Sequence, residues 1–265
     1  MTRLPDAIAG RFDPIGLAEA EERAPFAIRT DRKYVLDPAT FAQLAERLVD
    51  DHLALDVGGR RLSSYDTIYF DTPELLSFRQ HVQGRRRRFK CRTRLYGGGG
   101  PCFVEVKLKG PRGETLKRRL EVPVPGHGEL AEASLGFLAS ELLRAYGHGT
   151  PADLGTTLGT SFTRLTLVAR EARERVTCDF GLAFRSGETR HEIAPGRVVV
   201  ETKTALGNGV ADRHLRRLGV RPVTPCSKYC VGVALTRADV RDNAFRRLVR
   251  RHFVAPADAL AVEAT

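Results

Sequence analysis

The sequence has little that would support a disulfide framework, a cysteine-based metal cluster or a membrane span. Its 265 residues contain no tryptophan, one methionine and five cysteines, and no two cysteines form a C-x-x-C pair. An odd number of unpaired cysteines argues against a disulfide framework and a structural zinc site, so we expect reduced thiols. The chain also has no run of eighteen apolar residues and no secretory apolar core near its N-terminus. These absences predict a soluble, cytoplasmic protein without a transmembrane segment.

Phosphate-binding loops and histidine clusters are also missing. The four glycines at 97–100 are not part of a G-x-x-x-x-G-K-[ST] motif, which occurs nowhere in the chain. We therefore interpret the glycine run as a connector between two strands. The seven histidines are scattered and form no ligand cluster along the sequence.

What the chain has in excess is positive charge. Lysine and arginine total 43 against 32 aspartates and glutamates, which gives a formal charge of +11. Such a balance indicates an anionic partner: nucleic acid, a phosphorylated small molecule, a polyanion or an acidic membrane surface. The hydrophobic content of 42% is ordinary for a protein with a real core.

The basic residues alternate as in a strand within the stretch RRRRFKCRTRLYGGGGPCFVEVKLKG at 85–110. Before the glycine run, Lys90, Arg92 and Arg94 fall on one face and mainly apolar residues on the other. After it, Glu105 and Lys107 share a face, while two valines and a leucine occupy the opposite one. Each predicted strand therefore has an apolar side and a strongly charged side. The same spacing pairs Asp31 with Lys33, Lys117 with Arg119, Arg175 with Asp179, and Glu201 with Lys203.

We interpret the chain as one α+β domain at 26–254, with a flexible lead-in at 1–25 and a tail at 255–265. Parallel strands buried on both faces would read as continuous apolar runs, so two-faced strands favour an antiparallel sheet. The predicted strands, about eight, lie at 26–36, 62–70, twice within 85–110, and at 115–124, 161–170, 173–184 and 197–204. The predicted helices lie at 38–53, 71–84, 129–147 and over most of 210–253.

A sheet that collects like charges on one face needs a compensating anion, because like charges opposed across strands repel. For any single strand, a solvated polar face is the alternative. A closed barrel with helices outside accounts for the whole set, since helices cover the apolar faces and the charged faces line an interior. That interior must be wet, and it would attract phosphate. Asp31, Glu105 and Glu201, with Asp179 as a further candidate, supply oxygen ligands suited to Mg²⁺ or Mn²⁺.

Seven short motifs follow one another in the chain: DRKY (31–34), YFDT (69–72), CRTRLYG (91–97), FVEVKLK (103–109), RVTCDFGL (175–182), VETK (200–203) and CSKYCVGV (226–233). In this order they resemble the VTC domain, the polyphosphate polymerase module of the triphosphate tunnel metalloenzyme (CYTH-like) superfamily. In DRKY, aspartate replaces the family's glutamate. The similarity runs from about residue 26 to about residue 233, which is most of the chain.

The resemblance implies a closed antiparallel barrel of eight strands around a tunnel, with helices packed outside. The cations implied to act in catalysis are Lys33, Arg92, Arg94, Lys107, Arg164 and Lys228. The residues implied to bind substrate are Lys90, Lys117, Arg119, Arg175, Lys203 and Ser227, with Lys117 and Arg119 as alternatives because they share a face. Glu201 is the main implied ligand of Mn²⁺ or Mg²⁺, assisted by Glu105 and Asp31. Phe162 stands where the family usually has a tyrosine.

The function implied by the resemblance is ATP-dependent synthesis of inorganic polyphosphate, in which ATP donates its γ-phosphoryl group to a chain threaded through the tunnel. Phosphoryl transfer asks a protein mainly for in-line positioning and charge neutralisation. With water as acceptor the same site would be a triphosphatase, and a cyclase is a further alternative. A non-catalytic module for polyphosphate or nucleic acid is the alternative of another class. The expected partners are ATP or another triphosphate and inorganic polyphosphate; no specific nucleic acid is expected, and the oligomeric state stays open.

Two basic segments lie outside these motifs. RRRR at 85–88 is interpreted as a solvated charge run, with nucleic-acid or membrane binding as the alternative. DVRDNAFRRLVRRHFV at 239–254 is predicted to form a basic amphipathic helix that packs on the barrel, with anchoring at an anionic surface as the alternative.

Overall fold

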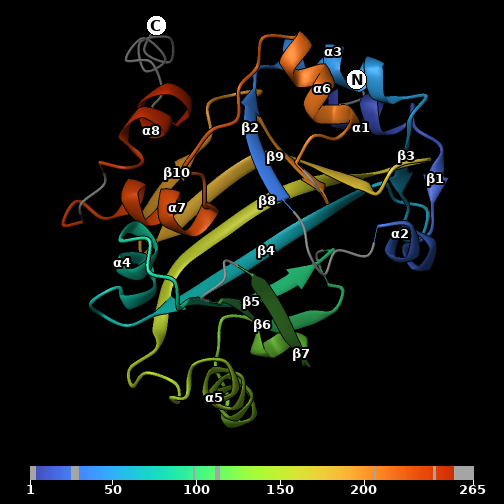
Figure 1. The fold of residues 1–265 in the computed structure, drawn as a ribbon. Coiled ribbons are helices and arrows are strands. Elements are labelled where there is room, and N and C mark those ends of the chain that lie inside the picture. The colour runs from blue at the N-terminus through green and yellow to red at the C-terminus, as the bar shows by residue number, and fades with distance from the viewer. Residues whose placement is uncertain are drawn as a thin grey trace, which may run out of the picture.

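The computed structural model describes residues 4–24, 30–97, 99–110, 114–205, 207–240 and 243–253. One large sheet dominates it, with antiparallel neighbours in the order β2-β11-β9-β8-β4-β5-β6-β7 (Figure 1). The strands of this path are β2 (Thr30–Leu36), β4 (Leu62–Asp71), β5 (Arg88–Tyr96), β6 (Cys102–Lys109), β7 (Thr115–Val122), β8 (Gly155–Ala169), β9 (Glu174–Ser186) and β11 (Val198–Thr204). The prediction of an α+β fold with an antiparallel sheet is confirmed.

Three short strands extend this sheet beyond the eight predicted. β3 (His52–Leu55) pairs with β8, and β1 (Pro14–Ile15) pairs with β3 in parallel. β10 (Thr189–Glu192) pairs with β9. The helix predicted from Pro38 was expected to include Leu53. Instead the helix ends at Leu48, and Leu53 lies in β3 opposite Val168.

The predicted closure of the sheet into a barrel stays a prediction, because the hydrogen-bonded ladders of the described residues form an open path. β2 and β7 end the path, and no hydrogen-bonded ladder joins them there. A physical reason lies in β7, where Lys117, Arg118 and Arg119 put charge on both faces of the strand, as is usual for an edge. The sheet is nevertheless strongly curved (Figure 1). Lys107 on β6 interacts electrostatically with Lys33 on β2 and Glu201 on β11, so the distant strands face a common interior.

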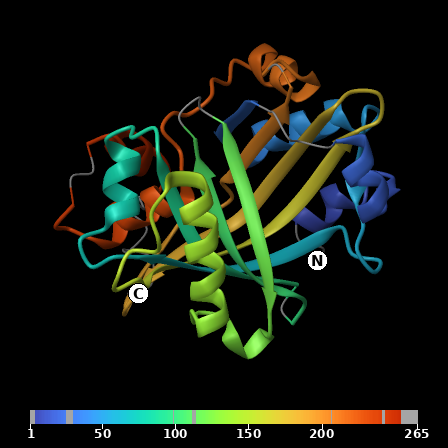
Figure 2. The ribbon, with the colours of Figure 1, turned by 60° about the horizontal axis from the view of Figure 1, so that its bottom comes forward.

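Helices cover the outer, apolar face of the curved sheet in two groups. α1 (Leu4–Ala9), α3 (Pro38–Leu48) and α6 (Val210–Arg217) pack over β2, β8, β9 and β11. α5 (Glu132–Tyr146) packs over β5 and β6, where Val104, Val106 and Leu138 are fully buried (Figure 2). α3 forms where predicted because Asp37 accepts a hydrogen bond from the Thr40 amide and Pro38 occupies the first turn. The predicted covering of the apolar faces by helices is thus confirmed.

A further helix lies against the inner face. α7 (Lys228–Thr236) packs its residues Tyr229, Cys230 and Val233 against Val35 and Val199, next to α4 (Leu76–Val82). Since side chains alternate along a strand, Val35 and Val199 share their face with Lys33 and Glu201. α7 therefore covers one end of the charged interior. Gly232 permits this close packing, because a Cβ there would lie 2.4 Å from Leu158 Cδ2.

The lead-in expected at 1–25 is folded from Leu4 onward. In α1 and the turn after it, Ile8 and Phe12 are buried in the cluster on the outer face of the sheet. Ile15 of β1 packs with α2 (Leu17–Arg23) against Val168, which lies opposite Arg175 and therefore on the inner face. The tail predicted at 255–265 lies outside the described residues. α8 (Arg246–His252) is shorter than the helix predicted at 239–254. All five cysteines are free, and no helix of the described residues is long and apolar enough to cross a membrane.

Candidate functional site

The strand register gathers the predicted basic and acidic residues on the inner face. Residues directly opposite each other in neighbouring antiparallel strands share a face. The pairs on this face include Glu201 with Lys33, Lys203 with Asp31 and with Arg175, Arg164 with Asp179, Arg92 with Glu105, and Lys107 with Lys90 and with Lys117.

Glu105 is the centre of one cluster. Its side chain is 2% exposed, and Oε2 lies 2.6 Å from Arg92 Nη2 and 4.0 Å from Arg94 Nη1. Oε1 accepts hydrogen bonds from Lys117 and, at 3.2 Å, from the Tyr96 hydroxyl. Burial alone would raise the pKa of this carboxyl, but Arg92, Arg94 and Lys117 hold its pKa well below the usual range. Glu105 is therefore ionised at any physiological pH and fixes three cations.

Asp179 is the centre of a second cluster, which ties α7 to the sheet. Arg164 forms a two-pronged contact with it, Nε to Oδ1 at 2.6 Å and Nη2 to Oδ2 at 2.9 Å, and Lys228 Nζ also bonds Oδ2. Asp179 is 1% exposed, and although burial opposes ionisation, Arg164 and Lys228 lower its pKa to about 2. The geometry does not support Asp179 as a metal ligand, because both of its oxygens are already occupied by cations.

Glu201 is the centre of a third cluster, which is less enclosed. Lys203 Nζ lies 2.9 Å from Oε2 and Lys33 Nζ lies 3.5 Å from Oε1, and the side chain keeps 16% of its exposure. Burial would raise the pKa of Glu201, but Lys203 and Lys33 hold it well below the usual range. Asp31 belongs to this region, since it lies opposite Lys203 and interacts electrostatically with it.

Lys90 and Lys107 are the least neutralised cations of the interior. Among the described residues neither of them forms an ion pair. Lys90 Nζ contacts Ser227 Oγ at 2.8 Å and His81 Nδ1 at 3.1 Å, and burial lowers its pKa. The Lys107 side chain has contact with solvent. Partial loss of hydration among the surrounding protein groups, together with the charge of Lys33, lowers the pKa of Lys107 to about 8. Lys107 is accessible to solvent and is repelled by other lysines, so an anion bound in a hydrated interior would reduce this repulsion.

Aromatic rings line the interior beside the start of α7, where Lys228 Nζ lies 4.7 Å from the centroid of the Phe162 ring. Tyr65 stacks on Phe162 with centroids 5.0 Å apart and contacts Tyr96 at 4.9 Å. The guanidinium carbons of Arg94 and Arg164 lie over Tyr65 at 5.2 and 4.9 Å. These cation–π contacts and the carboxylate bonds hold both arginines in fixed orientations. Phe162, which replaces the family's usual tyrosine, takes part in this packing with its ring.

Two predicted residues lie at the margin of the site. Arg175 donates from Nη2 to the Ala20 carbonyl at 2.8 Å, toward α2. Arg119 lies over the Phe103 ring at 4.7 Å and is exposed. Of the two alternatives, Lys117 bonds Glu105, whereas Arg119, which lies opposite Glu105 in the strand register, contacts the Phe103 ring instead.

A resident metal ion would depend on few protein ligands here. Within the described ranges no three His, Cys, Asp or Glu side chains converge on one point. Glu105 fits poorly as a ligand, because Arg92, Lys117 and Tyr96 engage both of its oxygens. Glu201 with Asp31 on the adjacent strand fits better, because the Lys33 contact to Glu201 is long, at 3.5 Å, and the Glu201 side chain is 16% exposed. Mg²⁺ commonly takes one or two carboxylates and completes its coordination with water and substrate phosphates.

Sequence reasoning missed several residues that shape the site. His81, on α4, contacts Lys90 although 9 residues separate them. A helix was predicted at 71–84, with Asp71 or Thr72 as its cap, but α4 begins only at Leu76, so Asp71 precedes it. Its carboxylate is 2% exposed and accepts hydrogen bonds from the Ser77 and Phe78 amides and, at 2.5 Å, from the Tyr229 hydroxyl on α7. The motif YFDT contained this aspartate, but only the folded chain shows that it anchors α7.

Comparison with known proteins agrees with this architecture. Residues 28–237 match the family model of the VTC domain. A putative adenylyl cyclase from Hippeastrum, described as having a dominant triphosphatase activity, superposes with a TM-score of 0.51 at 15% identity, over 77% of this chain and 94% of that one. A putative adenylate cyclase from Vibrio parahaemolyticus shares 13% identity over 77% of this chain and 97% of its own, with a TM-score of 0.41.

A third solved structure, the protein PH1819 from Pyrococcus horikoshii, shares 17% identity, covers 76% of this chain and 95% of its own, and has a TM-score of 0.42. No curated protein matches the chain in a sequence search. The likeness to the Hippeastrum protein supports the fold, and the family model covers well over half of the chain. The chain therefore belongs to the VTC domain family.

Proposed function

We propose that this protein transfers the γ-phosphoryl group of ATP to a growing inorganic polyphosphate chain within the charged interior. The observation that carries the proposal is the excess of interior cations over carboxylates. Lys33, Lys90 and Lys107 approach one another from β2, β5 and β6, and the last two have no carboxylate partner among the described residues. A chain of phosphates would neutralise this repulsion along its whole length.

The arginines supply positioning. Arg92 and Arg164 are held by Glu105 and Asp179, so their remaining N–H groups point in fixed directions at no further cost in side-chain entropy. Arg94 donates from Nε to Thr67 at 3.1 Å and is equally restrained. Such preorganised donors stabilise charge on transferring phosphoryl oxygens better than mobile groups would. Lys228 and Ser227, at the start of α7, close the row beside Lys90.

The acidic residues have two roles in this proposal. Glu105 and Asp179 orient cations, while Glu201 with Asp31 would hold Mn²⁺ or Mg²⁺ jointly with phosphate oxygens. When bound, the metal would neutralise charge on the transferred group. Lys33 and Lys203 flank Glu201 and would hold the same phosphates from either side. Loss of Glu201 should therefore lower turnover strongly without abolishing anion binding.

A triphosphatase is the second candidate. The structurally similar Hippeastrum protein is described as a triphosphatase, and the same cations would act on a triphosphate with water as acceptor. The deciding experiment is incubation of the purified protein with ATP and Mn²⁺, followed by sizing of the products. Formation of long polyphosphate chains would support a polymerase, and release of free phosphate would support a triphosphatase. Absence of turnover, with retained triphosphate binding, would leave a polyanion-binding module and overturn the proposal of an enzyme.

A further inference from the structure

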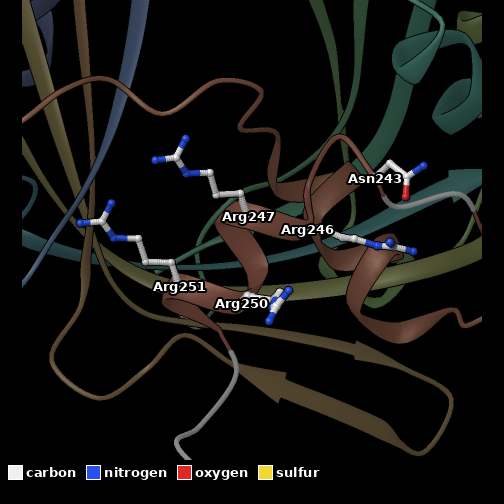
Figure 3. A pocket seen from close by; sticks show the side chains of 5 residues that line it. All are labelled: Asn243, Arg246, Arg247, Arg250 and Arg251. Carbon is white, nitrogen blue, oxygen red and sulfur yellow. The ribbon is translucent and has the colours of Figure 1, made fainter.

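The surface of α8 carries a concentrated basic patch that the proposed reaction does not use. Arg246, Arg247, Arg250 and Arg251 are all exposed, and with Asn243 they line a hollow of about 490 Å³ (Figure 3). Arg247 and Arg251 extend side by side in one direction, while Arg246 and Arg250 extend in another. We refer to the four arginines as the α8 patch.

The helix that carries the patch is firmly anchored. Phe245 and Leu248 are 0% and 8% exposed, and the Phe253 ring packs on Phe184 with centroids 5.6 Å apart. The His252 carbonyl accepts a hydrogen bond from the Ala194 amide at 2.8 Å. The apolar side of α8 is thus buried within the protein, and the arginine side is held toward solvent. Its position is close to α7, because both helices share one hydrophobic cluster.

Three of the four arginines of the patch have no ion-pair partner in the described residues. α8 contains no acidic residue, and its arginines form two like-charged pairs at i,i+4 spacing, which repel on a helix. In the part of the chain that the structure describes, Arg247, Arg250 and Arg251 form no ion pair, whereas the nearby Arg237 and Arg190 pair with Asp239 and Glu192. An external polyanion would supply the missing counter-charge.

The surroundings of the patch favour one kind of polyanion. Its aromatic neighbours, Phe245 and Phe253, are buried, so no ring is available to stack with nucleic-acid bases. Leu248 is buried too, so α8 has no apolar side to insert into a bilayer. What remains is a set of guanidinium groups, which bind phosphate oxygens in two-pronged fashion.

We propose that the α8 patch is a second binding site, outside the interior, for inorganic polyphosphate chains. The choice of polyphosphate rests on the proposed function, since that reaction would produce such chains next to α7. A long polyphosphate chain binds in the interior and at the patch at the same time, whereas a triphosphate is too short to reach both. The patch therefore raises affinity for long chains through a second point of attachment.

The test compares two charge-matched variants, Arg247→Gln/Arg251→Gln on α8 and Arg213→Gln/Arg217→Gln on α6. Both remove two exposed arginines at i,i+4 spacing from a helix surface. The α8 variant should bind long-chain polyphosphate about tenfold more weakly, with a salt dependence reduced by roughly one to two phosphate contacts. Its affinity for tripolyphosphate and its turnover of ATP should equal those of wild type. The α6 variant should match wild type throughout.

Equal weakening in both variants, or none in the α8 variant, would overturn the proposal. Equal losses for single-stranded DNA or anionic vesicles would overturn the assignment to polyphosphate. The failure of the proposed function looks different: wild type would make no long polyphosphate chains from ATP and Mn²⁺, whatever the α8 variant does to the binding of long chains.

Discussion

The interior contains two regions that differ in how their positive charges are neutralised. Around Glu105 and Asp179, arginines are locked on buried carboxylates and stacked on aromatic rings. Around Lys90 and Lys107, lysines face one another with no carboxylate partner in the described chain. The first region resembles a rigid structural core. The second is a set of charges whose mutual repulsion Glu201 and Asp31 offset only in part, so it marks the place where an anion would bind.

The largest effect should follow from breaking the arginine region at Asp179. Asp179→Ala leaves Arg164 and Lys228 buried without their counter-charge, so the free energy of unfolding should fall by about 3–5 kcal/mol. Chemical denaturation monitored by circular dichroism measures this. Glu192→Ala, which breaks an exposed pair with Arg190, serves as the control and should change stability by less than about 1 kcal/mol. Similar losses in the two variants would contradict the view of Asp179 as a buried anchor.

Glu201→Ala tests the metal-holding role that we propose for Glu201. We expect turnover of ATP to fall by about 10²–10³-fold, equivalent to roughly 3–4 kcal/mol of transition-state stabilisation. Triphosphate binding, measured by calorimetry without metal, should be unchanged or tighter, since Lys33 and Lys203 lose a competing carboxylate. Weaker binding with unchanged turnover would refute the metal-holding role of Glu201.

The lysine region should make both the stability and the triphosphate affinity of the protein depend on pH. Burial and Lys33 lower the pKa of Lys107 to about 8, so the unfolded chain binds more protons than the folded one between about pH 8 and the ordinary lysine pKa of 10.5. Stability of the free protein should therefore rise with pH across this range. Triphosphate affinity should fall over the same range as the lysine loses its charge. Because Lys107 is solvent-exposed, we expect a change in stability of about 1 kcal/mol or less.

Lys107→Met provides the matched variant for this titration. Its stability curve should be flatter above pH 8, and its triphosphate affinity should be weaker but less dependent on pH. An unchanged pH profile in Lys107→Met would assign the titration to Lys117, whose pKa burial also lowers to about 8.

The smallest effect should come from the aromatic end of the arginine region. Tyr65→Leu removes the ring that stacks on Phe162 and lies under Arg94 and Arg164. A loss of about 0.5–2 kcal/mol in unfolding free energy is expected. Because the carboxylate bonds still orient Arg164, turnover should fall by less than in Glu201→Ala. A larger loss of turnover than in that variant would mean that the ring contacts the substrate.

Much of the fold was predictable because strand alternation is a local signal. The two faces of 88–96 and 102–109 follow from period-two spacing, and the helix at Pro38 follows from its cap. The folded segment at 4–24 was not predictable in the same way, since its burial depends on contacts with β3 and β8 that lie far along the chain. Closure of the sheet stays a prediction, because it depends on how β2 and β7, which are far apart in the chain, meet in space.

By itself, the sequence determined that charged and apolar residues lie on opposite faces of the strands, and that the chain carries the ordered motifs of its family. Only the tertiary structure decided which carboxylate neutralises which cation, that α7 covers one end of the interior, and that Lys107 approaches Lys33 across it. The physical reason is range. Side-chain alternation is set by neighbouring residues in one strand, whereas the state of a charge is set by groups a few ångströms away that arrive from distant segments.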